Sequence, residues 1–445
     1  MYATSQSGQV TPRFTLKHGR IVSQNTVGGS VTVQWDSSYN IGFDLGNDAV
    51  NNVLIGNQSY AASQYNGNIS GMAWKSAHDN KVRKYDFVDD AADRLNTANF
   101  NQYVSQVFTS SPVNYSVSGL GYDANGNILE MNQDGLKAGG TSAIIDQLTY
   151  NYQPGSNKLS SVPDAAPVDS AEHLGDFQNG VNTGDDYTYD ANGNMASDAT
   201  KKITAIIYNS LNLPEVIRVG GKGSIYYSYD ATGNKLRKRT VDSTSLPAKT
   251  VVTTYINNGV YLNDTLQLFG TTEGRVRPVG TIFVNDYFLK DHLGNTRMVI
   301  TDDYSVSSPI LEASSYYPFG LMQKGIGMTA SGSLHNYKNT FLKQERNEDF
   351  GVDIYEFKYR MDDPQIGRFW QIDPLADDYT YNSPYAFSKN KIIGDIELEG
   401  LEAKDAKKGI AITTGVTTAT TSGRLIQVSE AFGPLVLFLE FRLRQ

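Results

Sequence analysis

The 445-residue chain contains no cysteine, which excludes disulfide bonds, thiolate metal ligands and cysteine nucleophiles. No stretch reaches the ~18 apolar residues that a membrane-spanning helix needs, so we expect no transmembrane span. Basic residues are outnumbered, 38 against 47 acidic ones, and the net charge of −9 argues against a nucleic-acid partner. Met1 is followed by a polar stretch without the apolar segment of a signal peptide, so none is predicted.

Leucine-rich helical periodicity is scarce in the sequence, whereas glycine (41 residues) and tyrosine (28 residues) are abundant. Short strands joined by tight turns use both residue types. Glycine fits turns that need unusual backbone angles, and tyrosine packs half-buried between strands. The composition therefore predicts an all-β protein built from many short strands.

A short phrase that begins with Tyr-Asp recurs along the chain. Its copies are Tyr122–Ile128, Tyr189–Met195, Tyr229–Lys235, the altered Asp291–Thr296, and the degenerate copies at 88–95 and 208–213. From Asp190 to Asn209 is 19 residues, and from Asn209 to Asp230 is 21 residues. A period of about twenty residues indicates an internal repeat, which takes precedence over local patterns.

Each copy has the residues of a hairpin turn. Aspartate can accept hydrogen bonds from nearby backbone N–H groups, glycine adopts a positive φ, and asparagine tolerates the left-handed region. A single hairpin is marginally stable in water, so the repeats are expected to pair side by side into one sheet. We expect a positive φ at the three turn glycines. The predicted turn residues are Asp123, Gly126, Asn127, Asp190, Gly193, Asn194, Asp230, Gly233 and Asn234.

The segment Asp353–Leu401 begins with alternating aromatic and charged residues, the period of two that is typical of a half-buried strand. Four short phrases follow in order: Tyr359-Arg360, Asp363-Pro364, Gly367-Arg368-Phe369 and Asp373-Pro374. Together with the Tyr-Asp repeat, this order resembles the Rhs/YD-repeat family, and specifically its repeat-associated core module. The spacing of the phrases is specific, and the resemblance covers about residues 65–401.

The resemblance implies antiparallel hairpin repeats that form a curled sheet or partial hollow shell, closed at one end by the core module. The implied segments are a divergent β-rich part at 1–64, YD repeats at 65–285, the core module at 286–401 and a variable tail at 402–445. The tail is expected to be partly helical or disordered, and its 44 residues are few for an enzyme. The basic run Lys235–Arg239 is expected on a strand that faces solvent or the lumen.

The role implied by the family is structural. Its members include shells that house or present a C-terminal effector polypeptide in secreted or cell-surface bacterial toxin systems. The implied partners are the chain's own C-terminal segment or N-terminal repeats that this sequence does not contain. A different interpretation of the same repeats is a cell-surface protein that binds carbohydrate or a target cell.

Related toxin components have a core module that resembles an aspartyl protease and cuts its own chain. The resemblance makes Asp373 one catalytic carboxylate and places the cleaved bond between Leu401 and Glu402. The second acid is expected in an Asp-Pro pair, but this sequence has Glu397 followed by leucine, so an inactive remnant is favoured over an active protease. Arg368 is the candidate side chain for steadying either carboxylate.

The sequence predicts no cofactor and no metal site. The five histidines are isolated from one another in the sequence and do not have metal-ligand spacing. Asp123, Asn125 and Asn127 resemble the start of a calcium-binding loop. Positions 6 and 12 of such a loop need glycine and glutamate, and here they are Ile128 and Asp134.

Overall fold

The computed structural model describes residues 68–76, 78–166, 174–179, 184–329 and 340–405, except the side chains of Glu402 and Asp405. Before residue 68 it describes the backbone of five strands. The expectations for residues 406–445 and for most of 1–64 therefore lie outside the described residues. In the part that the structure describes, no helix is long and apolar enough to cross a membrane.

The all-β prediction is confirmed, because two large antiparallel sheets contain most of the described strands. The first sheet, in spatial order, is β1 (Tyr2–Gln6), β2 (Gln9–His18), β5 (Tyr39–Gly46), β6 (Gly71–Ser76), β7 (Val82–Asp89), β8 (Leu95–Val104), β10 (Val117–Tyr122), β11 (Ile128–Leu136) and β12 (Ser142–Thr149), with β9 (Val107–Thr109) paired to β8. The second sheet is β15 (Tyr187–Tyr189), β16 (Met195–Asp198), β17 (Ile203–Tyr208), β18 (Pro214–Val219), β19 (Gly223–Tyr229), β20 (Lys235–Asp242), β21 (Lys249–Ile256), β22 (Gly259–Leu262), β23 (Thr265–Gly270), β24 (Gly274–Val279), β25 (Ile282–Lys290), β26 (Thr296–Thr301), β27 (Ile310–Ala313) and β28 (Met328–Thr329).

Smaller elements complete the described chain. Two hairpins are β3 (Ile21–Val27) with β4 (Ser30–Trp35), and β13 (Asn151–Tyr152) with β14 (Leu159–Ser161). A small sheet consists of β29 (Glu345–Asn347), β30 (Ile354–Glu356), β31 (Met361–Asp363) and β32 (Arg368–Phe369). The last hairpin is β33 (Asp395–Leu398) with β34 (Glu402–Asp405), and the 3-10 turns are η2 (Asp349–Gly351), η3 (Ala376–Tyr379) and η4 (Phe387–Asn390).

The repeated phrase forms one turn geometry in all of its copies. In the first copy the backbone N–H of Asp123 donates to the Asn127 carbonyl (3.0 Å), and the N–H of Gly126 donates to the Asp123 carbonyl (3.1 Å). The Asp123 Oδ1 accepts the N–H groups of Asn125 and Asn127. The same bonds occur at positions 90, 190, 209, 230 and 291. The turn prediction is confirmed, with φ of 77° at Gly126, 85° at Gly193 and 83° at Gly233.

The tyrosine that precedes the turn links three of the repeats to the repeat before them. The hydroxyl of Tyr122 donates to the carbonyl of Leu95 (2.6 Å), and the hydroxyl of Tyr208 donates to the carbonyl of Met195 (2.6 Å). Tyr229 makes the equivalent bond one repeat later. In each case the acceptor lies just after the preceding turn, so the ring fills the space between neighbouring hairpins and its hydroxyl is satisfied.

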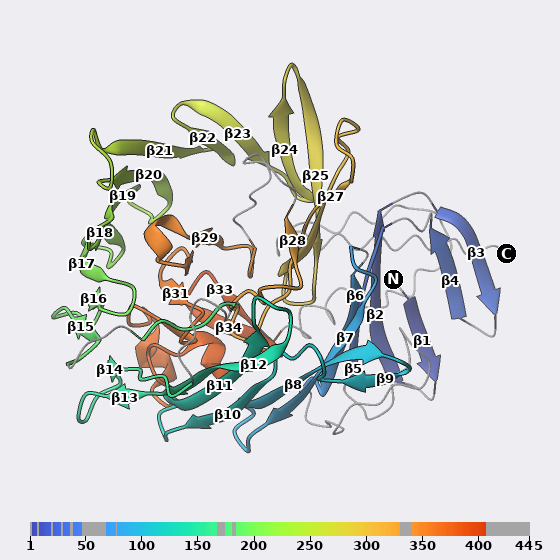
Figure 1. Cartoon of the computed structure of the whole chain (residues 1–445), viewed down its shortest axis with the longest axis horizontal. Helices are drawn as coiled ribbons and strands as arrows, with labels where there is room; N and C mark the ends of the chain where they lie inside the picture. Colours follow the sequence, from blue (N-terminus) through green and yellow to red (C-terminus); the bar gives the residue numbers. More distant parts are fainter. Residues whose placement is uncertain are drawn as a thin grey trace.

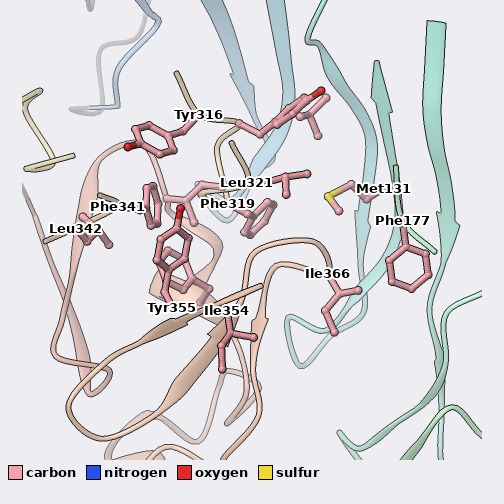
Figure 2. Close-up of a cluster of buried hydrophobic side chains, with 14 of the residues drawn as sticks. Met131, Phe177, Tyr316, Phe319, Leu321, Phe341, Leu342, Ile354, Tyr355 and Ile366 are labelled. Atoms are coloured by element: carbon pink, nitrogen blue, oxygen red, sulfur yellow. The ribbon is translucent and has the colours of Figure 1, made fainter. Parts of the chain in front are cut away.

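The two sheets curl around the last described part of the chain (Figure 1). We call residues 68–329 the wall and residues 340–405 the plug. The wall contacts the plug over long sequence separations: the Tyr150 hydroxyl donates to the Ile366 carbonyl (3.2 Å). A continuous apolar cluster joins the two parts, and Figure 2 shows members from the wall, such as Met131 and Phe177, and from the plug, such as Phe341 and Tyr355.

The end of the wall contacts its beginning through side chains. In the described residues, no ladder of backbone hydrogen bonds joins the two large sheets. The Gln323 Nε2 donates to the Tyr85 hydroxyl (2.7 Å), and the Tyr115 hydroxyl donates to the Lys324 carbonyl. The Arg297 guanidinium lies 5.1 Å from the ring centre of Trp74. Strands β6 and β7 therefore lie beside the end of the second sheet (Figure 1).

Candidate functional site

Three charged side chains of the plug meet at one point. Arg360 precedes β31, Asp373 follows β32, and Glu397 lies in β33. Backbone bonds fix these segments: the Asp373 N–H donates to the Pro384 carbonyl (2.9 Å), and the Tyr359 N–H donates to the Glu399 carbonyl (3.1 Å). The structure therefore brings the two predicted carboxylates together.

Arg360 lies between the two carboxylates. Its Nη2 is 2.9 Å from the Asp373 Oδ2 and 3.4 Å from the Glu397 Oε1. Its Nε donates to the Gly400 carbonyl (2.6 Å), and its guanidinium lies 3.8 Å from the ring centre of Phe369. The side chain is 1% exposed, so these contacts replace water. One guanidinium thus holds both carboxylates and the turn that follows β33.

Burial opposes the charge of every group in this cluster. Burial raises the pKa of Glu397 to about 7, although the nearby Arg360 cation lowers it. Burial also raises the pKa of Asp373 above its usual value, again against the Arg360 cation, and it lowers the pKa of Arg360 itself. Near neutral pH, Glu397 is therefore protonated in a substantial fraction of molecules. The pair can hold one proton donor and one ionised carboxylate.

The predicted cleavage position lies next to this cluster. Leu401 and Ala403 line the same small pocket as Arg360, Asp373 and Glu397. The chain reverses directly before Leu401, where the backbone φ is positive at two successive residues. The bond between Leu401 and the following glutamate therefore belongs to the loop that the arginine holds.

Arg368 lies elsewhere, contrary to the expectation that it steadies a carboxylate. Its Nη1 donates to the Tyr152 hydroxyl (3.1 Å), its Nη2 donates to the Asn157 carbonyl (2.8 Å), and its guanidinium lies over the Tyr385 ring at 4.9 Å. Arg368 precedes Phe369 in β32, and successive strand residues point to opposite faces. The ring therefore packs on Arg360 while Arg368 points to the wall. Arg360 was present in the sequence motif, but the motif does not say which arginine reaches the acids.

The repeat turns support the plug. The Tyr385 hydroxyl donates to the Gly193 carbonyl (2.6 Å), and the Asn390 Nδ2 donates to the Gly126 carbonyl (2.8 Å). A Cβ on Gly193 would lie 2.4 Å from the Ile372 Cδ1. The absence of a side chain at this turn therefore allows the plug to approach the wall closely.

A second charged cluster joins the wall to the plug. The Lys235 Nζ contacts Glu356 and lies 2.7 Å from the Glu345 Oε2. The Lys238 Nζ lies 3.5 Å from the Glu345 Oε1, and the Tyr227 hydroxyl bonds to the Glu356 Oε1 (2.7 Å). The two lysines come from β20, and both glutamates come from the plug. These two lysines of the basic run face the lumen, which was one of the two expected orientations.

One group of carboxylates in the described residues has the spacing to hold a cation. The ligand atoms of Asp146, Asp164 and Asp176 lie within 4.8 Å of one another. The same carboxylates already accept protein hydrogen bonds: Asp146 from the Phe177 N–H (2.8 Å) and Asp164 from the Gln147 N–H (2.7 Å). Burial raises the pKa of Asp146 to about 8. Hydrogen bonds from the protein therefore hold Asp146 and Asp164 in place, and burial favours the protonated form of Asp146.

Comparison with known proteins finds little similarity in sequence but similar folds among solved structures. No protein-family model matches the chain. Salivary gland surface protein 1 of Aedes aegypti is 25% identical over 230 residues, covering 48% of this chain and 6% of that protein.

Solved structures of Tc toxin complexes resemble the fold. The Photorhabdus luminescens Tc holotoxin pore, carrying a TccC3 mutation, has a TM-score of 0.50 and 14% identity, and covers 86% of this chain and 19% of that chain. The TcdB2-TccC3-Cdc42 structure has a TM-score of 0.50 and 16% identity, with 89% and 20% coverage. TcdB2-TccC3 without its hypervariable C-terminal region has a TM-score of 0.50 and 14% identity, with 86% and 19% coverage. This chain therefore spans about a fifth of these chains, and its curled antiparallel wall is a fold that Tc toxin complexes also contain.

Proposed function

We propose that this chain is the closing section of an Rhs-type β-shell, which encloses or presents the polypeptide that follows residue 401. The observation that carries the proposal is the plug inside the curled wall, bound by buried ion pairs and by turn carbonyls. A wall whose inner face binds its own later residues is suited to hold a chain segment. The remaining shell would come from further repeats.

The comparisons support the setting of this proposal. One of the similar structures is TcdB2-TccC3 without its hypervariable C-terminal region, so that protein has a variable segment at its C-terminal end. By analogy, residues 402–445 are the variable segment here, after YD repeats at 65–285 and a core module at 286–401. The proposed setting is a secreted or cell-surface toxin-like system, with the tail or further repeats as partners.

Single cysteines can test whether the tail is enclosed, because the chain contains no cysteine of its own. We expect a maleimide–polyethylene glycol reagent to label Ser429→Cys in the tail at least about tenfold more slowly than Ser245→Cys, which lies in the exposed connection between β20 and β21. The measurement is the labelling rate of the folded protein by gel shift. Both variants should label equally fast in denaturant.

Equal rates in the folded protein would show that the tail is not enclosed. That result would leave presentation outside the wall as the role of the shell, and it would remove the housing role. The denatured control separates enclosure from an intrinsic difference in cysteine reactivity.

A second candidate function is cleavage of the chain after Leu401. The observation that favours it is the pocket shared by Leu401, Asp373 and Glu397, with the raised pKa values described above. An ionised Asp373 would act as base on a water molecule, and a protonated Glu397 would donate to the leaving group.

The mass of the purified protein under denaturing conditions tests this function. An active site would release residues 402–445, and Asp373→Asn would keep the chain intact because the amide cannot act as the base. If the unmodified chain has the full mass of 445 residues after incubation, the arginine and the two acids have only a structural role.

A further inference from the structure

A second buried contact between wall and plug has more carboxyl groups than basic side chains. The Lys201 Nζ, from the wall turn between β16 and β17, lies 3.2 Å from the Asp363 Oδ1 of the plug. It also donates to the Gln365 Oε1 (3.2 Å). Asp198 lies beside the same turn, and its Oδ1 accepts the backbone N–H of Lys201 (3.1 Å). We call Asp198, Lys201, Asp362 and Asp363 the Lys201 joint.

Three carboxyl groups lie near Lys201, and all are fully buried. The lysine ammonium pairs with Asp363, and its charge lowers the pKa values of all three carboxyl groups. Asp198 and Asp362 are 0% exposed, and Asp363 is 1% exposed. Among the described residues, neither carboxyl oxygen of Asp362 has a hydrogen-bond partner, and one oxygen each of Asp198 and Asp363 also has none. Ionising all three would bury uncompensated negative charge, which is costly in a protein interior.

The groups around the joint do not supply the missing charge. Asp353 lies near Lys201, but it forms a two-point pair with Arg346. Arg360 and Glu397 lie near Asp362, and that arginine is already shared by two carboxylates. The tyrosines near these carboxyl groups are Tyr150, Tyr187 and Tyr355, which are neutral phenols because burial raises their pKa values. Asp186, near Tyr187, is a further acid.

We propose that the Lys201 joint is a proton-operated latch that seats the plug in the wall when its aspartates are protonated and loosens the plug as they ionise. The proposal rests on the proposed function, because it regulates the same enclosure of the plug. The latch acts through the ion pair between Lys201 of the wall and Asp363 of the plug.

The direction of the pH effect follows from burial. Burial raises the pKa of Asp363 to about 6, although the Lys201 cation lowers it, and burial also raises the pKa values of Asp198 and Asp362. A carboxyl whose folded pKa is raised stabilises the folded state below its unfolded pKa, near 4. That contribution is lost as the pH rises through the folded pKa, which is about 6 for Asp363.

The cluster at Lys235 provides a contrast within the same interface. There two lysines neutralise the plug glutamates, and the pKa of Glu345 is lowered to about 2, chiefly by Lys235 and Lys238 against burial. Its contribution is therefore fully present above the unfolded pKa of glutamate, near 4.5, and is lost as the pH falls from there through about 2, so it does not change near pH 6. The two contacts respond to protons in opposite directions.

Native-state hydrogen exchange of peptides covering 355–369, corrected for intrinsic rates, tests the latch in the full chain. From about pH 4 to pH 7, ionisation of Asp363 alone should raise the local opening constant about 50-fold. Asp363→Asn should remove about that factor. Glu345→Gln, the matched control from the other cluster, should keep it.

A second variant protects the test against a folding defect. Asp198→Asn keeps the Oδ1 acceptor for the turn, and it should also reduce the pH dependence. Protection that is strong and unchanged between pH 4 and pH 7 would overturn the latch and leave the enclosed plug in place. Absence of protection at every pH would contradict the enclosed plug itself.

Discussion

Replacing Glu356 by alanine is expected to lower the free energy of unfolding by about 3 to 5 kcal/mol, the cost of breaking a buried ion pair. Glu356 is the plug carboxylate that contacts Lys235, Asn347 and Tyr227, and its side chain is 2% exposed. Its removal leaves a buried lysine with one carboxylate fewer, the Tyr227 hydroxyl without its acceptor and the Asn347 amide with one acceptor fewer. Urea denaturation at neutral pH and low salt measures the effect.

A pair on the surface serves as the matched control. The Lys358 Nζ and the Glu399 Oε2 are 4.0 Å apart, with side chains 31% and 60% exposed. Glu399→Gln should change stability by no more than about 0.5 kcal/mol. A loss at Glu356 as small as this would mean that water reaches the cluster and that the plug is not seated. Combining Glu356→Leu with Lys235→Met should recover part of the loss, because no charge then remains unpaired.

Replacing Gly193 by valine is expected to destabilise the protein by about 3 kcal/mol, from two separate causes. A β-branched residue resists the φ of 85°, and its Cβ would lie 2.4 Å from the Ile372 Cδ1 of the plug. The change in urea midpoint, with an unchanged m-value, gives the loss.

The equivalent glycine of another repeat separates the two causes. Gly233 has a φ of 83°, but the nearest atom to its Cβ is the Leu213 Cδ1 at 3.4 Å. Gly233→Val should therefore cost only the backbone strain, about 1 to 2 kcal/mol. Equal losses at the two glycines would mean that the plug does not press on the turn at Gly193.

The turns could be predicted from the sequence because their interactions are local. Asp190 bonds to backbone groups two and four residues later, so the phrase itself contains every partner. The same locality makes the degenerate copy at 208–213 recognisable from the sequence, although Asn209 replaces the aspartate. The tyrosine hydroxyl bond was not predicted, because its acceptor lies in the previous repeat.

The contacts of the plug could not be predicted in this way. Lys201 and Asp363 meet only because the wall curls around the plug, and nothing near either residue in the sequence indicates the other. Choosing between Arg360 and Arg368 required the strand register, which decides the face on which each side chain lies. The motif brought Asp373 and Glu397 to attention, but the guanidinium between them is visible only in the fold.

The order of synthesis gives the tyrosine links between neighbouring repeats a further consequence. Each hairpin can form against its predecessor as it leaves the ribosome, because its partners have already emerged. The plug follows the wall in the sequence, so the wall must keep its curvature before the plug fills it. During that interval the lumen-facing Lys235 and Lys238 have no glutamate partners and remain hydrated, which favours an open wall over collapse onto itself. The lysines that later bind the plug therefore help to keep the lumen of the wall open and hydrated until the plug has been synthesised.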